Sequence, residues 1–103
     1  MHILLVHAEL RVSETLKAQM EAAGVRVDTA RNTAWALELA GTHSLDLVLI
    51  DPRIERGGGW QLIRHLRRMP GLRELPILVL SPETARQIGS VSWPSLKIEP
   101  EPA

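Results

Sequence analysis

The sequence predicts an α/β fold in which a parallel sheet is doubly wound, with helices on both faces. The first observation is that short apolar runs alternate with amphipathic stretches of helical period. The second is that two runs, residues 45–50 (LDLVLI) and 76–80 (PILVL), are apolar without alternation, as in central strands covered on both faces. The third is length, because 103 residues suit one small domain. We expect that domain to cover residues 1–98, with residues 99–103 (EPEPA) as an extended tail or the start of a linker.

The first half of the chain supplies two of the expected strands and two helices. Residues 2–6 (HILLV) have the length of a strand, and residues 25–29 alternate apolar with polar side chains, which indicates a strand near a sheet edge. Between them, residues 9–23 repeat apolar side chains at helical spacing, and Gly24 suits a left-handed cap. Asn32 predicts the N-cap of a helix over residues 33–40. The predicted inward side chains of the two helices are Val12, Leu16, Met20, Ala23, Ala36, Leu37 and Ala40, and Trp35 beside them is also expected to pack in the core.

The second half adds a loop, a third long helix and a weaker end. Residues 52–59 are expected to form a flexible loop, and residues 60–69 a helix ended by Pro70 and Gly71. That helix is predicted to face inward through Trp60, Ile63 and Leu66. After residue 81 we expect only a short helix over 83–88 and a short edge strand over 96–98.

The composition narrows the classes of function. Twelve Lys and Arg balance twelve Asp and Glu, so no overall field draws the chain to nucleic acid or an anionic membrane. The absence of cysteine excludes disulfides and thiolate chemistry and suits a reducing compartment. The apolar opening is too short for a signal peptide or a membrane span. We therefore expect a cytoplasmic chain that does not enter membranes.

Several segments in order carry a resemblance to a known family. They are ILLV, EAAGVRVDTA, ALELA, DLVLID and GWQLIRHLRRMPGLRELPILVLS, spread over residues 2–81. This set resembles the receiver domain of bacterial response regulators. The resemblance implies a flavodoxin-like sheet with strand order 2-1-3-4-5 and a role in two-component signal transduction or a phosphorelay. The part of the family fold that holds the fourth helix, fifth strand and fifth helix is predicted to be shortened or missing here.

The resemblance also assigns roles to three residues. In the family, an aspartate that ends the third strand accepts a phosphoryl group, and Mg²⁺ neutralises charge on that group. Laid onto this sequence, Asp51 is the candidate phosphoacceptor. Ser81, at the end of the fourth strand, and the downstream Lys97 take the phosphate-contact positions.

The chief departure from the family lies after the first strand. The family's acidic pair, which helps to hold Mg²⁺, is replaced by His7 and Ala8, and Glu9 is the only other carboxylate nearby in the sequence. Glu9 and Asp51 are thus the residual carboxylates that could act as ligands, a poor set for an oxygen-loving ion. We expect no metal and no cofactor, with Mg²⁺ needed only if Asp51 is a working acceptor. His7 could instead bind a transition metal, hydrogen-bond Asp51 as an imidazolium, or face solvent.

These residues favour a pseudo-receiver, a receiver domain that acts by protein–protein interaction and is not an enzyme. One alternative is a phospho-accepting response regulator that uses Asp51. Another is a nucleic-acid-associated module that uses the basic third long helix and the residues after it, Arg64, Arg67, Arg68 and Arg73.

The weak end of the chain leads to a prediction about partners. If no fifth helix covers its face of the sheet, we expect a two-fold homodimer or a protein partner over that face. The alternative is that residues 89–98 fold back over it. Either way, the candidate contact residues are Val91, Trp93 and Leu96.

Overall fold

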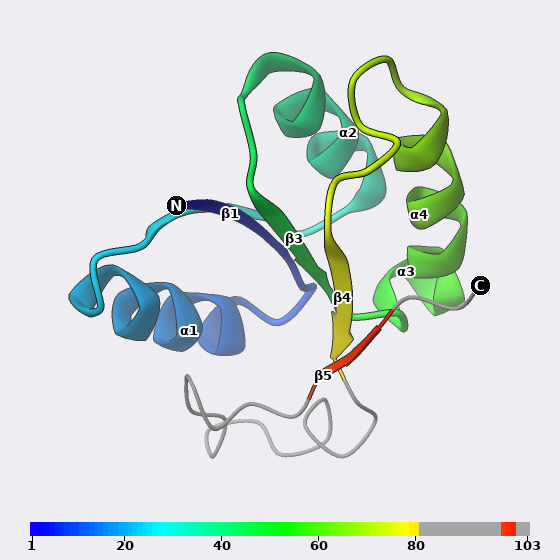
Figure 1. Ribbon diagram of the computed structural model, residues 1–103. Coiled ribbons are helices and arrows are strands. Elements are labelled where there is room, and N and C mark those ends of the chain that lie inside the picture. Colours follow the sequence, from blue (N-terminus) through cyan, green and yellow to red (C-terminus); the bar gives the residue numbers. More distant parts are fainter. Residues whose placement is uncertain (81–97, 101–103) are drawn as a thin grey trace.

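A computed structural model of the chain describes residues 1–80 and the backbone of residues 98–100 (Figure 1). Helices and strands alternate along the chain, as the apolar runs predict. The elements are β1 (His2–Val6), α1 (Leu10–Ala22), β2 (Arg26–Ala30), α2 (Thr33–Thr42), β3 (Leu47–Ile50), α3 (Ile54–Gly57), α4 (Gly59–Arg68), β4 (Ile77–Leu80) and β5 (Ile98–Pro100). The expected helix over residues 83–88 lies outside the described residues. None of the helices described is long and apolar enough to cross a bilayer.

The strands form one sheet in the order β2-β1-β3-β4-β5, as predicted. The first four strands pair in parallel, but β5 pairs antiparallel with β4, which the expectation of a parallel sheet did not foresee. Ile98 pairs with Leu80, at the point where β4 ends. A parallel neighbour would have to begin beside the start of β4, so the chain would need a crossover connection to reach that point. An antiparallel neighbour begins beside the end of β4 and needs no crossover.

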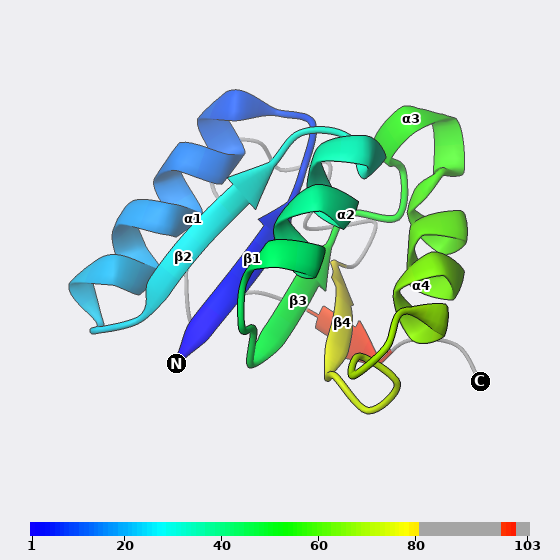
Figure 2. The same cartoon turned by 90° about the horizontal axis from the view of Figure 1, so that it is seen from above.

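Helices cover both faces of the sheet, which confirms the doubly wound arrangement. Figure 1 shows α1 on one side of the sheet and α2 and α4 on the other, and Figure 2 shows the same layers from above. Successive residues of β1 are buried against opposite sides: Leu4 and Val6 join the core under α2 and α4, whereas Ile3 and Leu5 join the core under α1. The continuous apolar runs are therefore strands covered by helices on both faces, as the sequence predicts.

Two tryptophans that the sequence places inside are exposed. Trp35 is 45% exposed and Trp60 is 40% exposed. In α4 the buried residues are Gly59, Leu62, Ile63 and Leu66, so the inward stripe begins one residue earlier than predicted and turns Trp60 away. In α2 the buried residues are Ala36 and Ala40, and Trp35 lies one residue off that stripe. Ala23, which the sequence also places inside, is exposed and lies just after the end of α1 at Ala22.

The caps between elements follow the sequence closely. Gly24 has a φ of +88°, the left-handed conformation expected after α1. The Asn32 side chain accepts a hydrogen bond from the Trp35 amide at 2.7 Å, so Asn32 is the predicted N-cap. The expected loop over residues 52–59 instead contains α3, a single turn in which Glu55 and Arg56 adopt positive φ angles of 49° and 57°. Two non-glycine residues in this conformation make the turn strained.

Candidate functional site

His7 and Asp51 lie side by side at the carboxyl ends of β1 and β3. The pairing of Val6 with Ile50 brings the next residue of each strand together. The His7 amide donates to the Ala30 carbonyl at 3.0 Å and the Asp51 amide donates to the Val6 carbonyl at 2.9 Å, so both backbones are fixed by the sheet. His7 is 1% exposed and Asp51 is 4% exposed. The strand ends thus hold an imidazole and a carboxylate away from water.

The ring of His7 is held in one tautomer. Its Nδ1 accepts a hydrogen bond from the Glu9 amide at 3.0 Å, so the ring proton sits on Nε2. Nε2 lies 3.4 Å from Oδ2 of Asp51 and has no hydrogen-bond partner among the described residues. This buried nitrogen is thus a donor near the carboxylate that makes no hydrogen bond with it.

The charge state of His7 follows from its burial. Loss of solvent lowers the pKa of His7 below its ordinary value of 6.5, and the nearby carboxylates of Asp51 and Glu9 offset only part of this effect. The ring is therefore neutral at pH 7, in agreement with an Nδ1 that accepts a hydrogen bond. Two of the expectations for His7 are thus wrong: it does not face solvent, and it is not the imidazolium partner of Asp51.

The charged neighbour of Asp51 is Arg53, which the sequence analysis missed. The Arg53 amide donates to Oδ1 of Asp51 at 3.0 Å, and the Nε atom of the Arg53 side chain lies 3.6 Å from the same oxygen. The signal was present in the sequence, because an aspartate commonly accepts from the amide two residues further on. Oδ1 of Asp51 is thus hydrogen-bonded by the turn that follows β3.

The residues around Asp51 do not fit Mg²⁺. This ion prefers several oxygen ligands in octahedral geometry, but here its nearest neighbours are the Nε2–H of His7 and the guanidinium of Arg53. Ala8 offers no ligand side chain. Within residues 1–80, no three His, Asp or Glu side chains are grouped so that they could hold a metal ion, and this includes His7, Glu9 and Asp51. For the same reason, the described residues do not form the transition-metal site that was considered for His7.

Other predicted site residues lie outside the part of the chain that the structure describes. These are the phosphate-contact positions Ser81 and Lys97 and the interface candidates Val91, Trp93 and Leu96. Their roles therefore stay predictions.

The predicted basic cluster divides into two parts. Arg64, Arg68 and Arg73 are exposed. Arg67 instead turns back, and its Nη1 donates to the carbonyls of Leu72 at 3.1 Å and Leu75 at 2.6 Å. It thereby ties the end of α4 to the loop before β4.

The sheet order, the helices on both faces and the aspartate that ends β3 together define a receiver-type α/β domain. The sequence model of the response regulator receiver domain matches residues 3–90, and the chain belongs to this family. This match confirms the resemblance to response-regulator receiver domains that the sequence segments indicate.

Known proteins agree with this assignment. The chain is 33% identical over 81 residues to the transcriptional regulatory protein CusR of Escherichia coli. The matched stretch covers 79% of this chain and 35% of CusR. The chain thus spans about a third of the length of the curated relatives it matches.

Solved structures share the fold. The chemotaxis response regulator CheY4 of Vibrio cholerae superposes with a TM-score of 0.73 at 24% identity, over 80% of this chain and 72% of that chain. A chain from the crystal structure of histidine kinase ThkA in complex with the response regulator protein TrrA superposes with a TM-score of 0.70 at 27% identity, over 79% of this chain and 68% of that chain. The similarity to solved structures therefore supports the flavodoxin-like architecture, in agreement with the family match of the sequence.

Proposed function

We propose that this chain is a pseudo-receiver, which acts in cytoplasmic signal transduction by binding another protein and not by regulated phosphorylation of Asp51. The surroundings of Asp51 carry this proposal. Transfer of a phosphoryl group to a carboxylate needs a free oxygen and a cation that neutralises the transferring group. Here Oδ1 of Asp51 accepts from the Arg53 amide, and Oδ2 faces the buried Nε2 of His7.

The replacement of the acidic pair supports the same conclusion. His7 supplies a neutral nitrogen that already carries its proton on the side of Asp51, and Ala8 supplies a methyl group. A single carboxylate beside them is a poor site for Mg²⁺, which sheds its waters reluctantly. In this proposal the chain needs no cofactor and catalyses no reaction.

The proteins to which the chain is similar support the proposal of a protein partner. CusR is a transcriptional regulatory protein, and TrrA forms a complex with a histidine kinase. We extend from these relatives only the general role, which is that a receiver domain contacts another signalling protein.

A second copy of this chain is one such partner. Leu47 of β3 and Leu78 of β4 pack on the core under α1 and are only partly buried. We propose that this side of the sheet takes part in a two-fold homodimer. Analytical ultracentrifugation at micromolar concentration tests it: Leu78→Glu should shift a dimer to monomer, and a strictly monomeric wild type would contradict the dimer.

Phosphorylation is tested by incubating the chain with Mg²⁺ and acetyl phosphate, followed by intact-mass measurement. We expect no substantial phosphate adduct, whereas a receiver domain with an intact acidic pair, treated in parallel, should gain one. An adduct that disappears in Asp51→Asn would make the chain a phospho-accepting regulator and overturn the proposal.

A further inference from the structure

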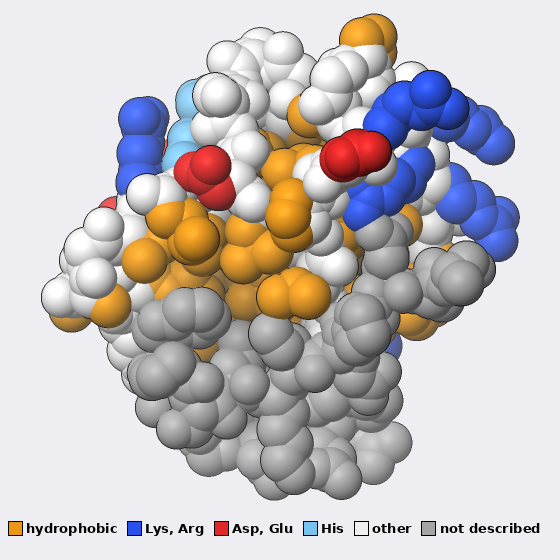
Figure 3. Space-filling view, in the orientation of Figure 1, with side chains coloured by type: hydrophobic (Ala, Val, Ile, Leu, Met, Phe, Trp, Pro, Cys, Tyr) orange, Lys and Arg blue, Asp and Glu red, His pale blue; other side chains and the backbone are white. Residues whose placement is uncertain are grey.

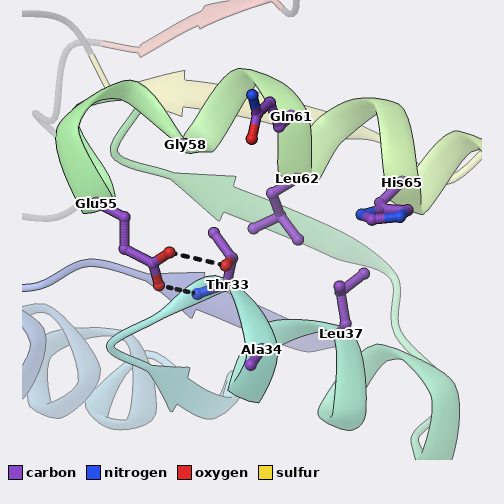
Figure 4. A pocket seen from close by; sticks show the side chains of 8 residues that line it. All are labelled: Thr33, Ala34, Leu37, Glu55, Gly58, Gln61, Leu62 and His65. Atoms are coloured by element: carbon purple, nitrogen blue, oxygen red, sulfur yellow. Dashed lines mark hydrogen bonds between the residues drawn. The ribbon is translucent and has the colours of Figure 1, made fainter.

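A groove runs between α2 and α4, on the side of the sheet opposite to α1. Its larger part, about 290 Å³, has an apolar floor formed by Ala34, Leu37 and Leu62. In Figure 4 the side chains of Leu37 and Leu62 point into the space between the two helices. A second part of about 240 Å³ lies along α4 and adjoins the first, since Gln61 and His65 line both.

The groove has a basic rim on α4. Gln61, Arg64, His65 and Arg68 line its second part, at spacings of three, four and seven residues that put them on one side of the helix. All four are exposed, and α4 contains no acidic residue. Figure 3 shows Lys and Arg side chains gathered on the side of the molecule where α4 lies. Among residues 1–80, no hydrogen bond or ion pair engages the guanidinium of Arg64 or Arg68.

The other end of the groove is acidic. There the Glu55 carboxylate accepts hydrogen bonds from the Thr33 amide at 2.7 Å and from the Thr33 hydroxyl at 3.0 Å (Figure 4). An apolar floor with a carboxylate at one end suits a nucleic acid poorly, since a phosphate backbone needs cations along its path and gains little from leucine side chains. The groove therefore combines apolar contacts with positive charge at one end, as grooves that take up an amphipathic helix do.

We propose that the groove between α2 and α4 is a docking surface for an acidic amphipathic helix of a partner protein. The apolar side of that helix covers Ala34, which is exposed, and the accessible part of Leu37, and its carboxylates pair with Arg64 and Arg68. The exposed side of α4, which has ten residues, is about 15 Å long, and a partner helix of about four turns, about 22 Å, is more than long enough to cover it.

This surface deepens the proposed function, from which it takes only the premise that the chain acts by binding a protein. It does not involve Asp51, which lies at the ends of the strands. Its failure can therefore be told apart from the failure of the proposed function: the phosphate adduct reports on Asp51, and docking reports on the groove.

The test uses the full chain and a designed probe. The probe is a fluorescein-labelled helical peptide of about four turns, with leucines on one side and glutamates beside them. A scrambled peptide of the same composition and a labelled DNA duplex serve as comparisons. Fluorescence anisotropy measures affinity, and ¹⁵N–¹H spectra of the labelled chain show where the probe binds. We expect the peptide to bind more tightly than its scrambled form and to shift the amides of residues 33–37 and 61–68.

Two variants test the basic rim and the interior of the groove. Arg64→Glu combined with Arg68→Glu should weaken binding of the probe at least about tenfold, because two attractive pairs become repulsive. Ala34→Glu places a carboxylate in the groove and should also weaken binding, while an acidic residue in the first turn of α2 favours the helix. The matched control is Arg11→Glu combined with Arg26→Glu, which changes the net charge equally at exposed positions on α1 and β2.

The outcomes decide the proposal in both directions. Binding that maps to the groove and is lost in both groove variants, but not in the control, supports it. It is overturned if the designed peptide binds no better than its scrambled form, if its shifts map elsewhere, or if only the DNA duplex binds and loses affinity in the Arg64 and Arg68 variant.

Discussion

The Nε2 atom of His7 lies 3.4 Å from Oδ2 of Asp51, inside the protein, with no closer polar partner among the described residues. The two groups are held by backbone contacts from different elements: the Glu9 amide donates to Nδ1 of His7, and the Arg53 amide donates to Oδ1 of Asp51. The pair is therefore a neutral donor beside a carboxylate, at the strand ends where the family resemblance places the acidic residues that hold Mg²⁺. Its properties lead to the first two predictions.

The stability of the chain should fall as the pH falls through 6.5, in part because of His7. Burial lowers the pKa of this imidazole below 6.5 in the folded state. Below that pH the unfolded chain takes up a proton that the folded chain does not, so the free energy of unfolding decreases. The decrease ends below the folded-state pKa, where both states carry the proton. Urea denaturation at several pH values between 5 and 8 measures the slope.

A pair of histidine variants isolates this contribution. His7→Asn keeps an acceptor near the Glu9 amide but cannot titrate, so the slope just below pH 6.5 should become smaller. His65→Gln, at an exposed histidine on α4, should keep the slope of the wild type. If His7→Asn leaves the pH dependence unchanged, the imidazole does not carry it.

Restoring the acidic pair should create a Mg²⁺ site. His7→Asp combined with Ala8→Asp puts three carboxylates at the ends of β1 and β3, a ligand set that suits this ion. Without Mg²⁺ the variant should be less stable than the wild type, because like charges repel in a buried site. With Mg²⁺ at about 100 times the dissociation constant it should gain about 2.7 kcal/mol. Thermal unfolding with and without Mg²⁺ measures both effects.

The control for the metal site is Asp51. Asp51→Asn in the double variant should remove most of the gain from Mg²⁺, and the wild type should gain little. A wild type that Mg²⁺ stabilises as strongly as the double variant, through Asp51, would contradict the proposal that the chain works without the ion.

The sequence predicted the order of elements because strand and helix periods are local properties. The run at residues 2–6 became β1 with the same bounds, and Asn32 caps α2 as expected. The location of His7 and Asp51 at neighbouring strand ends follows from the strand order that the family resemblance implies.

Other features depend on contacts between distant segments, which no local pattern shows. Trp60 is exposed because the tight fit of Gly59 against Pro52 fixes the inward side of α4. The direction of β5 depends on where the chain returns to the edge of β4. The neutral state of His7 depends on burial and on the Glu9 amide, neither of which is written in the spacing of His7 and Asp51.

Glu55 should stabilise the turn that follows β3. Its carboxylate accepts two hydrogen bonds from Thr33, at the start of α2, although its own backbone is strained at a φ of 49°. Glu55→Ala removes both bonds and leaves the strain, so it should destabilise the chain by about 1–2 kcal/mol. Urea denaturation measures the loss. Glu14→Ala, at an exposed position on α1, should change stability by less than about 0.5 kcal/mol, and an equal loss in both variants would show that the Thr33 contacts contribute nothing.

Two glycine-to-alanine changes should have opposite effects on stability. A Cβ at Gly59 would lie 2.7 Å from Cα of Pro52 and 3.0 Å from its carbonyl oxygen, so rigid backbone would have to move. We expect Gly59→Ala to cost about 1–3 kcal/mol, the range of overpacking in a core. A Cβ at Gly41, in the last turn of α2, meets only the flexible end of Met69 at 3.5 Å. Gly41→Ala should therefore stabilise the chain by about 0.4–1 kcal/mol, because alanine restricts the unfolded chain and favours the helix. Urea denaturation of the two variants beside the wild type measures both changes, and a Gly59→Ala variant as stable as the wild type would show that α4 does not approach Pro52 so closely.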